Sequence, residues 1–314
     1  MSGGHPGAGP APTVSVVIPT YNAEAAVLDA LASVVSQTYT DWEILVCDDG
    51  STDGTRAVAE RYLAAQEGAR WRILSLERGG PAETRNRGVR EARGEWIAFL
   101  DDDDGWAPQK LQRCMEAVGA GRLDVVGHSE AWVDDAGRSR PHHYSALFDA
   151  SVHPLVSLMR ANPFSTSALV VRRSALLEAG LFDPQLPSAE DYDLWIRLAM
   201  LPEIRIGFID EVLGTYRLRA GSESSRIDRR MRALLTIGAR YGDALAAVSR
   251  LGRLESWMFR SKTYFTSGLR LLRQGSPGRG AGLVAIGLLM WPFRFDWIRF
   301  AQRQRATRAV PAGS

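Results

Sequence analysis

The first hundred residues alternate between short apolar runs and longer segments with helical periodicity. Four runs predict strands, over residues 14–18, 43–47, 71–76 and 96–100, and the β-branched run of residues 14–18 is typical of a buried strand. The segments between them place apolar side chains at helical spacing, over residues 25–37, 55–66 and 82–92. Strands that alternate with helices form a mainly parallel sheet covered on both faces, so the sequence predicts an α/β fold.

The rest of the chain divides into regions of different character. Residues 1–12 are rich in Gly and Pro and lack an apolar core, which predicts a disordered tail and not a signal peptide. Residues 13–221 contain the predicted α/β domain, although its alternation weakens after residue 119. In that second half we predict strands over 123–126, 168–172 and 204–209, and helices over 174–179 and 194–200. Residues 222–314 predict a basic, aromatic-rich helical region.

The near-neutral charge of the whole chain hides a strong asymmetry. There are 38 basic and 36 acidic residues in total, a net charge of +2. Residues 1–221 carry 21 basic and 31 acidic side chains, whereas residues 222–314 carry 17 and 5. Such asymmetry suggests two regions with different partners. The apolar content of 45% excludes a disordered or fibrous chain. The two cysteines, Cys47 and Cys114, are too few for a disulfide framework and favour a reducing compartment.

Two interpretations of residues 222–314 remain open. Basic and aromatic side chains together are typical of a surface that touches anionic membrane lipids. Alternatively, the region is a helical subdomain whose arginines are simply solvated. The longest apolar run, residues 281–293, is shorter than the ~20 residues that a membrane span needs. We therefore expect a cytoplasmic protein, with peripheral contact at the inner face of the membrane as one alternative. No nucleic-acid recognition motif accompanies the charge, so no nucleic-acid partner is expected.

Three of the predicted strands end in candidate ligand-binding segments: the residues after Ile18, the Asp pair after Cys47 and the Asp run after Leu100. In parallel sheets, ligands bind beyond the carboxyl ends of the strands. Asp101, Asp102, Asp103 and Asp104 follow one strand, and such a run is either a site for Mg²⁺ or Mn²⁺ or a solvated acidic loop. Asp49 lies in an Asp-Asp-Gly-Ser segment after another strand. It can accept hydrogen bonds from a nucleotide, or the segment can form a turn whose Ser51 or Thr52 caps the next helix.

Three further features have competing interpretations. Glu190 and Asp191 precede an apolar helical stretch, so they are either candidate general bases or helix caps. His142 and His143 are either a metal pair or, as we favour, an exposed loop that could lie near an acceptor. Trp106 either flanks a bound sugar or packs in the core.

Taken in order, these segments resemble the family 2 glycosyltransferases, which are inverting enzymes with the GT-A fold. The matching segments are residues 16–22, 36–38, 48–53, 82–88, 94–104 and 190–195, with Tyr216 and Arg217. The resemblance covers roughly residues 13–221, and it rests on six motifs in register. It implies a GT-A domain, which is Rossmann-like with a mainly parallel central sheet flanked by helices, followed by the C-terminal helical region.

The resemblance also implies roles for individual residues. Pro19, Tyr21 and Asp49 match positions that hold the nucleoside of a nucleoside-diphosphate sugar, most often a UDP-sugar. Glu24 and Arg85 match positions that line the nucleotide pocket. Asp101, Asp102 and Asp103 match the Asp-X-Asp motif: Asp102 would lie near the ribose, and Asp103 with Asp101 would bind Mn²⁺ or Mg²⁺. Asp191 matches the catalytic base. The implied acceptor is a hydroxyl of a glycan or lipid-linked saccharide, as in cell-surface polysaccharide or glycolipid biosynthesis.

The sequence also departs from the family pattern. Arg219 stands where family members often carry a histidine, and arginine can pair with a phosphate but cannot ligate a metal. The Gln-X-X-Arg-Trp signature of processive synthases is absent, which favours the transfer of a single sugar. The alternatives are a nucleotidyltransferase, disfavoured because no Gly-rich triphosphate loop occurs, and an inactive, membrane-associated nucleotide-sugar binding protein of the same fold.

Overall fold

The computed structural model describes residues 11–218 and 226–290 of the chain. The predicted tail of residues 1–12 lies almost entirely outside these residues. The chain divides into two compact units, Met1–Ala220 (unit 1) and Gly221–Ser314 (unit 2).

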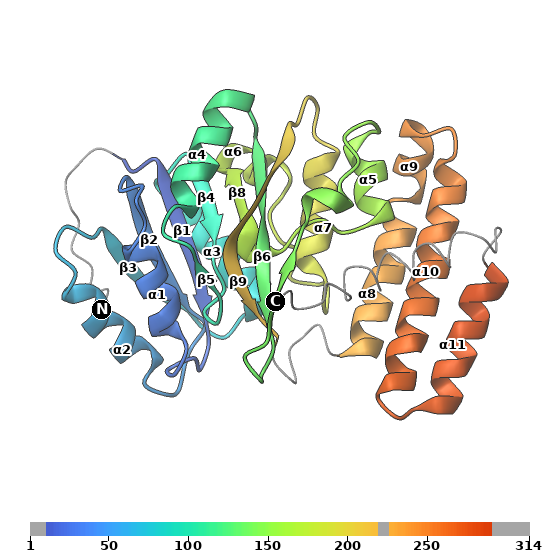
Figure 1. Cartoon of the computed structure of the whole chain (residues 1–314), viewed down its shortest axis with the longest axis horizontal. Coiled ribbons are helices and arrows are strands. Elements are labelled where there is room, and N and C mark those ends of the chain that lie inside the picture. The colour runs from blue at the N-terminus through green and yellow to red at the C-terminus, as the bar shows by residue number, and fades with distance from the viewer. Residues whose placement is uncertain (1–10, 219–225, 291–314) are drawn as a thin grey trace, which may run out of the picture. The chain divides into compact units, whose positions relative to one another are not determined.

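Within the described residues, unit 1 is built on a nine-stranded mixed sheet with the strand order β3-β2-β1-β4-β8-β6-β9-β5, and β7 pairs with β6 (Figure 1). The strands are β1 (Val14–Thr20), β2 (Trp42–Asp48), β3 (Trp71–Ser75), β4 (Trp96–Phe99), β5 (Gly105–Trp106), β6 (Val125–Val133), β7 (Ser139–His142), β8 (Leu169–Arg172) and β9 (Ile206–Arg217). The predicted parallel sheet is found in β3, β2, β1 and β4. In the second half β8 runs antiparallel to β4 and β6, while β6 and β9 are parallel.

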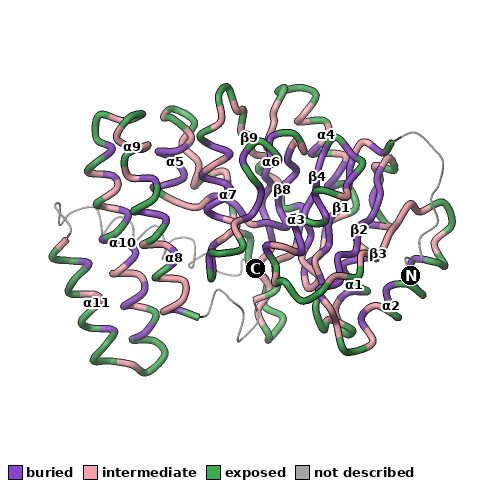
Figure 2. Tube along the Cα trace, turned by 180° about the vertical axis from the view of Figure 1, so that it is seen from behind, coloured by how far each residue is buried: buried purple, intermediate pink, exposed green. Residues whose placement is uncertain are grey.

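Helices cover both faces of this sheet. They are α1 (Val27–Val35), α2 (Thr55–Ala64), α3 (Gly80–Glu91), α4 (Lys110–Gly121), α5 (Pro154–Arg160), α6 (Arg173–Glu178) and α7 (Glu190–Ala199), with short 3₁₀ turns η1 (Ser145–Leu147) and η2 (Thr166–Ala168). Figure 2 shows the buried strands at the centre of unit 1 and more exposed helical surfaces around them. This three-layer arrangement is the α/β architecture that the sequence predicted.

The alternation of side chains along the strands separates two cores. Val16 and Ile18 of β1 belong to a cluster that includes buried residues of α1, α2 and α4. Val17, between them, points to the other face, where a side chain at Gly88 of α3 would come within 2.5 Å of its Cγ1. On that same side, Phe99 of β4 packs edge-on against Trp195 of α7, with ring centres 6.3 Å apart. Thus α3 and α7 share the face that α1 and α2 do not cover.

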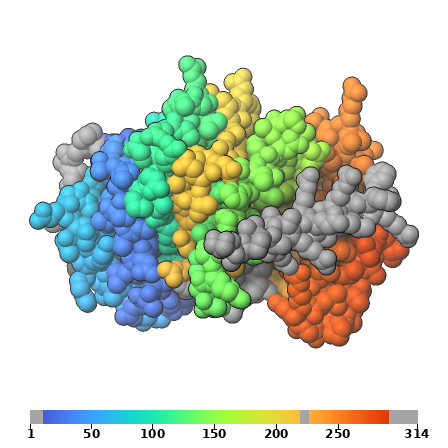
Figure 3. All heavy atoms as spheres, in the orientation of Figure 1, coloured from blue at the N-terminus to red at the C-terminus, as the bar shows by residue number. Residues whose placement is uncertain are grey.

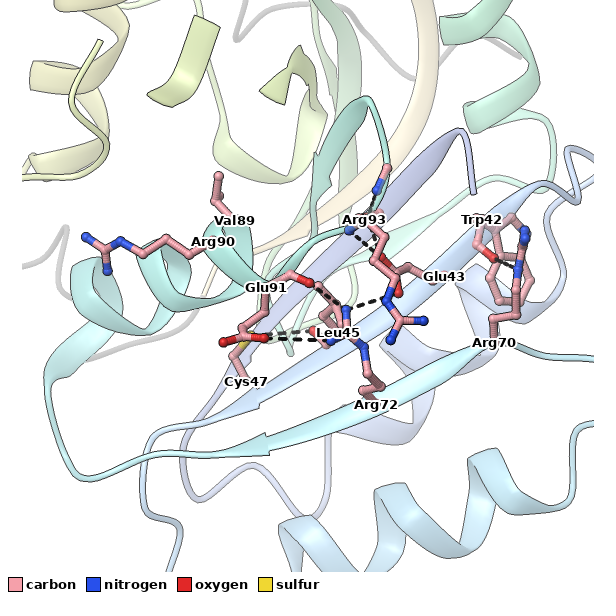
Figure 4. Close-up of polar contacts among 12 residues, drawn as sticks. Trp42, Glu43, Leu45, Cys47, Arg70, Arg72, Val89, Arg90, Glu91 and Arg93 are labelled. Carbon is pink, nitrogen blue, oxygen red and sulfur yellow. Dashed lines mark hydrogen bonds and ion pairs between the residues drawn. The ribbon is translucent and has the colours of Figure 1, made fainter. Parts of the chain in front are cut away.

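A buried polar network fastens the end of α3 to the sheet (Figure 4). The Glu43 carboxylate in β2 accepts the Ser15 hydroxyl at 2.7 Å and the Arg93 backbone N–H at 2.8 Å. Arg72 of β3 lies between Glu43 and Glu91, donating to the Glu43 carboxylate at 3.3 Å and to the Glu91 carbonyl at 2.6 Å. Because Glu43 is buried, these bonds satisfy a charge that would otherwise be costly. The network fixes the position of α3, which carries Arg85.

Several boundaries differ from the sequence predictions for identifiable reasons. The first strand was predicted to stop before Pro19, but β1 continues to Thr20. A proline is tolerated there because pairing with β4 ends at Val17, and Pro19 faces only β2. Ser51 and Thr52 do not cap α2; its first N–H groups are taken by Asp53 and Glu24. The weakly periodic α4, α5, β5 and β7 were not predicted.

Unit 2 contains four helices within residues 226–290: α8 (Ile227–Arg240), α9 (Gly242–Val248), α10 (Gly252–Arg273) and α11 (Pro277–Met290). Small residues let α10 and α11 pack closely, since a Cβ on Gly268 would lie 2.7 Å from the Gly280 carbonyl oxygen. The predicted helical character of this region is confirmed for these residues. None of the described helices is long and apolar enough to cross a bilayer.

Candidate active site

The three segments that the sequence placed at the ligand-binding edge lie together. Strands β1, β2 and β4 are parallel neighbours, so their carboxyl ends meet at one edge of the sheet. The backbone N–H of Tyr21, just after β1, points to the Asp102 carboxylate at 3.4 Å. The N–H of Asp49, just after β2, donates to the Thr20 carbonyl at 2.9 Å. Pro19 is half-buried near the end of β1.

Asp49 shapes the turn between β3 and α3. Its carboxylate accepts the backbone N–H groups of Gly79 at 2.7 Å and Gly80 at 3.0 Å. Gly80 has a φ of +81°, a left-handed conformation that favours glycine. This turn brings Arg78 onto Tyr21, with the guanidinium carbon 3.1 Å from the centre of the tyrosine ring. A flat aromatic ring, an arginine and a carboxylate therefore form one cluster at the sheet edge.

Sequence reasoning missed Arg78, although its position just after a strand, at the edge already singled out, was an available signal. Glu24, by contrast, is exposed and performs a structural task. Its carboxylate accepts the N–H of Gly54 at 3.0 Å, which satisfies a free donor at the start of α2. Glu24 thus lies beside the nucleotide edge and holds the loop there.

The four consecutive aspartates are not equivalent. Asp104 is only 2% exposed and accepts the Ser167 hydroxyl at 2.6 Å and the Arg217 backbone N–H at 3.0 Å. Burial, together with the charges of Asp101 and Glu130, raises the pKa of Asp104 well above its usual value. Asp101, Asp102 and Asp103 are half-buried and are the members of the run that reach the surface. Asp104 therefore anchors the loop, while Asp101 and Asp102 contact Arg85 and the Tyr21 N–H at the site.

Arg85 links this loop to α7. Its guanidinium lies 2.7 Å from the Asp101 carboxylate and 3.4 Å from that of Glu190, and the residue is only 8% exposed. Burial opposes its charge, but the carboxylates of Asp101 and Glu190 outweigh that effect and raise the pKa of Arg85. Arg85 therefore stays cationic between two acidic segments that are far apart in the sequence.

The first turn of α7 holds the candidate base. Glu190 and Asp191 lie inside the helix, and its N-cap is Ala189, which makes no side-chain capping bond. The capping interpretation of these residues is therefore wrong. Burial, followed by the charge of Asp191, raises the pKa of Glu190, while Arg85 opposes the rise. The Asp191 carboxylate accepts the Tyr192 N–H at 2.7 Å and contributes to the field at Arg85. Carboxylates in a first turn also interact favourably with the helix dipole.

The donor chemistry of the site fits a divalent cation. Within residues 11–218 and 226–290, no group of three or more His, Cys, Asp or Glu is arranged to hold a metal by itself. Mg²⁺ and Mn²⁺, however, often take only one or two carboxylates and complete their shell with substrate phosphates and water. Asp101 and Asp103, half-buried at the end of β4, offer such ligands beside the cationic Arg85.

The remaining sequence candidates have other partners. His142 stacks on Trp132, and His143 bonds the Asp210 carboxylate at 2.8 Å, so the two histidines do not form a metal pair. Trp106 is buried and donates its indole N–H to the Ser167 carbonyl at 2.8 Å, so the packing interpretation is the correct one. Arg219 lies outside the described residues.

Comparison with known sequences places the chain in a family. The model of "Glycosyl transferase family 2" matches residues 15–179, which is more than half of the chain. An uncharacterized glycosyltransferase of Rickettsia felis is 31% identical over 211 residues, covering 67% of this chain and 34% of the relative. The E. coli UDP-Glc:alpha-D-GlcNAc-diphosphoundecaprenol beta-1,3-glucosyltransferase WfgD is 42% identical over 100 residues, covering 32% and 38% of the two chains. The chain thus spans only about a third of the length of these relatives.

Two solved structures share the fold. TarS residues 1–349 from S. aureus, in complex with UDP-GlcNAc, superpose with a TM-score of 0.64 at 21% identity, covering 89% of this chain and 82% of that one. The mannosyltransferase PcManGT from Pyrobaculum calidifontis, in complex with GDP-Man and Mn²⁺, gives a TM-score of 0.61 at 20% identity, covering 95% and 85%. The mixed sheet with flanking helices is therefore the GT-A fold that the motifs predicted. By its family match and its fold, the chain belongs to glycosyl transferase family 2.

Proposed function

We propose that the protein is an inverting, metal-dependent glycosyltransferase that moves one sugar from a nucleoside-diphosphate sugar to a hydroxyl acceptor. The observation that carries this proposal is the Arg85 bridge between Asp101 and Glu190. It joins the aspartate loop at the nucleotide edge to the helix turn that bears Asp191. The cationic guanidinium of Arg85 therefore lies between two parts of the proposed site. One part would bind the phosphates and the metal, and the other carries the candidate base Asp191.

The cluster of Tyr21, Asp49 and Arg78 suits the nucleoside. The ring of Tyr21 supplies a flat surface for a base, and Asp49 keeps acceptor capacity on a carboxylate that the Gly79 and Gly80 N–H groups hold in place. Pro19 and Asp102 flank Tyr21 on β1 and on the aspartate loop, and Glu24 supports the neighbouring loop. We assign the base and ribose of the donor to this group of residues.

The chemistry follows from charge. Arg85 would stabilise the negative charge that develops on the departing diphosphate, since its burial makes the interaction strong. A divalent ion held by Asp103 and Asp101 would supply Lewis-acid neutralisation of the same phosphates. Asp191 would accept the proton of the acceptor hydroxyl as that oxygen attacks the anomeric carbon. Because attack and departure occur on opposite faces in one displacement, the product has inverted configuration.

Donor and acceptor are proposed from the relatives' chemistry. TarS was solved with UDP-GlcNAc and WfgD is named for UDP-Glc, so a UDP-sugar is the first choice; PcManGT with GDP-Man makes a GDP-sugar the alternative. WfgD is named for a diphosphoundecaprenol-linked acceptor, which supports a lipid-linked or glycan hydroxyl here. Cell-surface polysaccharide or glycolipid synthesis is the corresponding process.

The test is a panel of UDP- and GDP-sugars with the purified full chain, Mn²⁺ or Mg²⁺, and candidate glycan acceptors. We expect nucleotide release that EDTA abolishes and that either cation restores. NMR of the product from an α-linked donor should show a β-linkage. Absence of binding and of turnover with every donor would contradict the proposal, and retention of configuration would contradict the direct displacement.

We further propose that unit 2 contacts the inner face of the membrane. Residues 226–290 contain 12 basic and 3 acidic side chains, a net charge of +9. On α11, the apolar residues Ile286, Leu288 and Leu289 are exposed, Leu289 to 86%. Positive charge beside exposed apolar side chains suits an anionic bilayer surface. Such contact would hold the enzyme near a lipid-linked acceptor.

A further inference from the structure

Three half-buried rings from three different strands form an aromatic platform, defined here as Trp132 of β6, His142 of β7 and Tyr216 of β9. The Trp132 and His142 rings are stacked, with centres 4.2 Å apart and planes 18° from parallel. The Tyr216 ring comes from the neighbouring strand β9, and its centre is 5.6 Å from that of Trp132. Trp132 and Tyr216 are directly opposite each other in the β6–β9 register, so both side chains stand on one face of the sheet.

A hydrogen-bonded layer beneath the platform holds Trp132 in place. The Trp132 indole N–H donates to the Tyr144 hydroxyl at 3.2 Å, and that hydroxyl donates to the Glu130 carboxylate at 2.8 Å. Tyr144 and Glu130 are both buried. Burying a carboxylate is costly, and a simple packing surface does not need one. The arrangement therefore resembles a preorganised binding surface more than a core.

The platform lies next to the aspartate loop, on the side away from the nucleoside cluster. Tyr216 precedes Arg217, whose backbone N–H bonds Asp104. Burial, with the charges of Asp104, Asp101 and Asp103, raises the pKa of Tyr216 to about 12, which agrees with this closeness. In the sheet, β4 and its aspartate loop stand between β1 and β2 on one side and β6 and β9 on the other. In Figure 3, β9 (gold) is at the surface beside the blue-green segment that follows β4.

The rings are suited to an uncharged ligand with flat apolar faces. Burial and the charges of Arg140 and His143 lower the pKa of His142 to about 4, so its ring is neutral at neutral pH. Arg140 adds a donor near the platform, with its guanidinium carbon 5.4 Å from the Trp132 ring centre. A saccharide presents C–H faces that pack on aromatic rings and hydroxyls that bond such donors, and binding sites commonly combine these features.

We propose that the aromatic platform binds a saccharide ring of the acceptor and orients its hydroxyl toward the aspartate loop. This inference rests on the proposed function, because an acceptor sugar is needed only if the protein transfers sugars. It adds Trp132, His142 and Tyr216 as acceptor-binding residues, with Tyr144 and Glu130 as positioning residues.

The test uses the full chain with diamagnetic Mg²⁺ and UDP, and p-nitrophenyl β-glycosides of glucose, galactose, mannose and N-acetylglucosamine as probes. Saturation-transfer NMR measures saccharide binding, and calorimetry measures binding of UDP with Mg²⁺. We expect at least one glycoside to bind, and Trp132→Ala and His142→Ala to weaken it by about fivefold or more. Trp257→Ala, which removes a 53% exposed tryptophan of unit 2, should leave saccharide binding unchanged. UDP binding should be the same in all four proteins.

His142→Ala keeps the test decisive if Trp132→Ala fails to fold, because His142 ends a short edge strand and supports less of the core. The inference is overturned if no glycoside binds the wild-type protein, or if folded His142→Ala binds the glycoside as tightly as wild type. If UDP did not bind the wild-type protein, that result would instead contradict the proposed function. The two failures are therefore distinguishable, because one concerns binding of the glycoside and the other concerns binding of UDP.

Discussion

Glu190 and Asp191 are adjacent in the first turn of α7 but have different partners. Glu190 pairs with Arg85, whereas the Asp191 carboxylate accepts the Tyr192 N–H. Because Arg85 already pairs with Glu190, we propose Asp191 as the group that takes the proton. We expect Asp191→Ala to lower kcat by about 10²–10⁴-fold, the usual contribution of a general base, while UDP binding with Mn²⁺ stays within about twofold. Steady-state kinetics and calorimetry measure the two effects.

The matched control for this change is Asp243→Ala, which removes a first-turn helix carboxylate from unit 2. It reproduces the loss of a favourable charge at a helix N-terminus without touching the site. Its kcat should equal that of the wild-type protein. Normal transfer by Asp191→Ala would show that another group is the base.

Glu130 makes the stability of unit 1 depend on pH. Burial raises its pKa from the usual 4.5 to about 7, against the opposing hydrogen bond from Tyr144. Between these two values the folded protein binds a proton that the unfolded chain does not, so stability falls as pH rises through this window. Glu130→Gln keeps an acceptor for Tyr144 and removes the titration. Its stability relative to wild type should therefore rise by about 1–3 kcal/mol between pH 5 and pH 8.

Thermal unfolding of wild type and Glu130→Gln at several pH values measures this difference. Each kcal/mol corresponds to about 2–4 °C in Tm for a unit of this size. Comparing the two proteins at each pH cancels the other titrating groups. A Tm difference that does not change with pH would mean that Glu130 titrates normally.

At the scale of elements, the sequence predictions were most accurate for strands that can be recognised from their own residues. The strands β1, β2 and β4 are apolar runs that are buried along nearly their whole length, so they were recognisable. The strand β3 was recognisable from its apolar residues, although it is mostly half-buried. By contrast, β7 and β5 exist because of pairing with β6 and β9, and short segments such as these have no period of their own. The position of Arg78 depends on the left-handed turn at Gly80, which only the fold defines.

The placement of α3 depends on a glycine. A methyl group on Gly88 would lie 2.5 Å from Val17 Cγ1 and 2.8 Å from Cys47 Sγ, both fully buried in the sheet. Gly88→Ala should therefore push α3 away and destabilise unit 1 by about 1–3 kcal/mol, as overpacking does. Because α3 carries Arg85, UDP binding with Mn²⁺ should weaken as well.

Gly119→Ala in α4 is the control, because a Cβ there would meet nothing within 4 Å. It should leave UDP binding unchanged and be neutral or stabilising by up to about 1 kcal/mol, the gain in helix propensity. Chemical denaturation measures both variants. Equal stabilities for the two alanine variants would contradict the close contact of α3 with the sheet.

At the scale of the whole molecule, the order of the motifs was enough to predict the GT-A fold through the family resemblance. Three of the motifs mark the ends of the parallel strands β1, β2 and β4 at one edge of the sheet. The order of the motifs could not predict that the four aspartates have different roles. Asp104 is buried by Ser167 and by the backbone of Arg217, which are 63 and 113 residues away in the chain. The Arg85–Glu190 pair likewise spans 105 residues. Contacts over such separations leave no local pattern.

The strong charge asymmetry of the chain leads to a prediction about its two units. Unit 1 contains the complete candidate site, and we expect a chain that ends at residue 220 to fold and to bind UDP with Mn²⁺ as the full chain does. The full chain should sediment with vesicles of phosphatidylglycerol and phosphatidylcholine. That binding should weaken as salt rises from about 0.05 to 0.5 M, because screening reduces the attraction of basic residues for anionic lipid. The shortened chain should stay in solution.

A double variant separates the apolar from the electrostatic contribution. Ile286→Ser with Leu289→Ser removes exposed apolar surface from α11 and leaves every arginine in place. It should bind the same vesicles less tightly and become still more sensitive to salt, because charge alone would then hold the protein at the surface. Leu177→Ser, an exposed leucine of α6 in unit 1, should bind like wild type. Vesicle binding by the shortened chain, or binding of the full chain that ignores both salt and lipid charge, would assign residues 222–314 to the solvated helical subdomain instead.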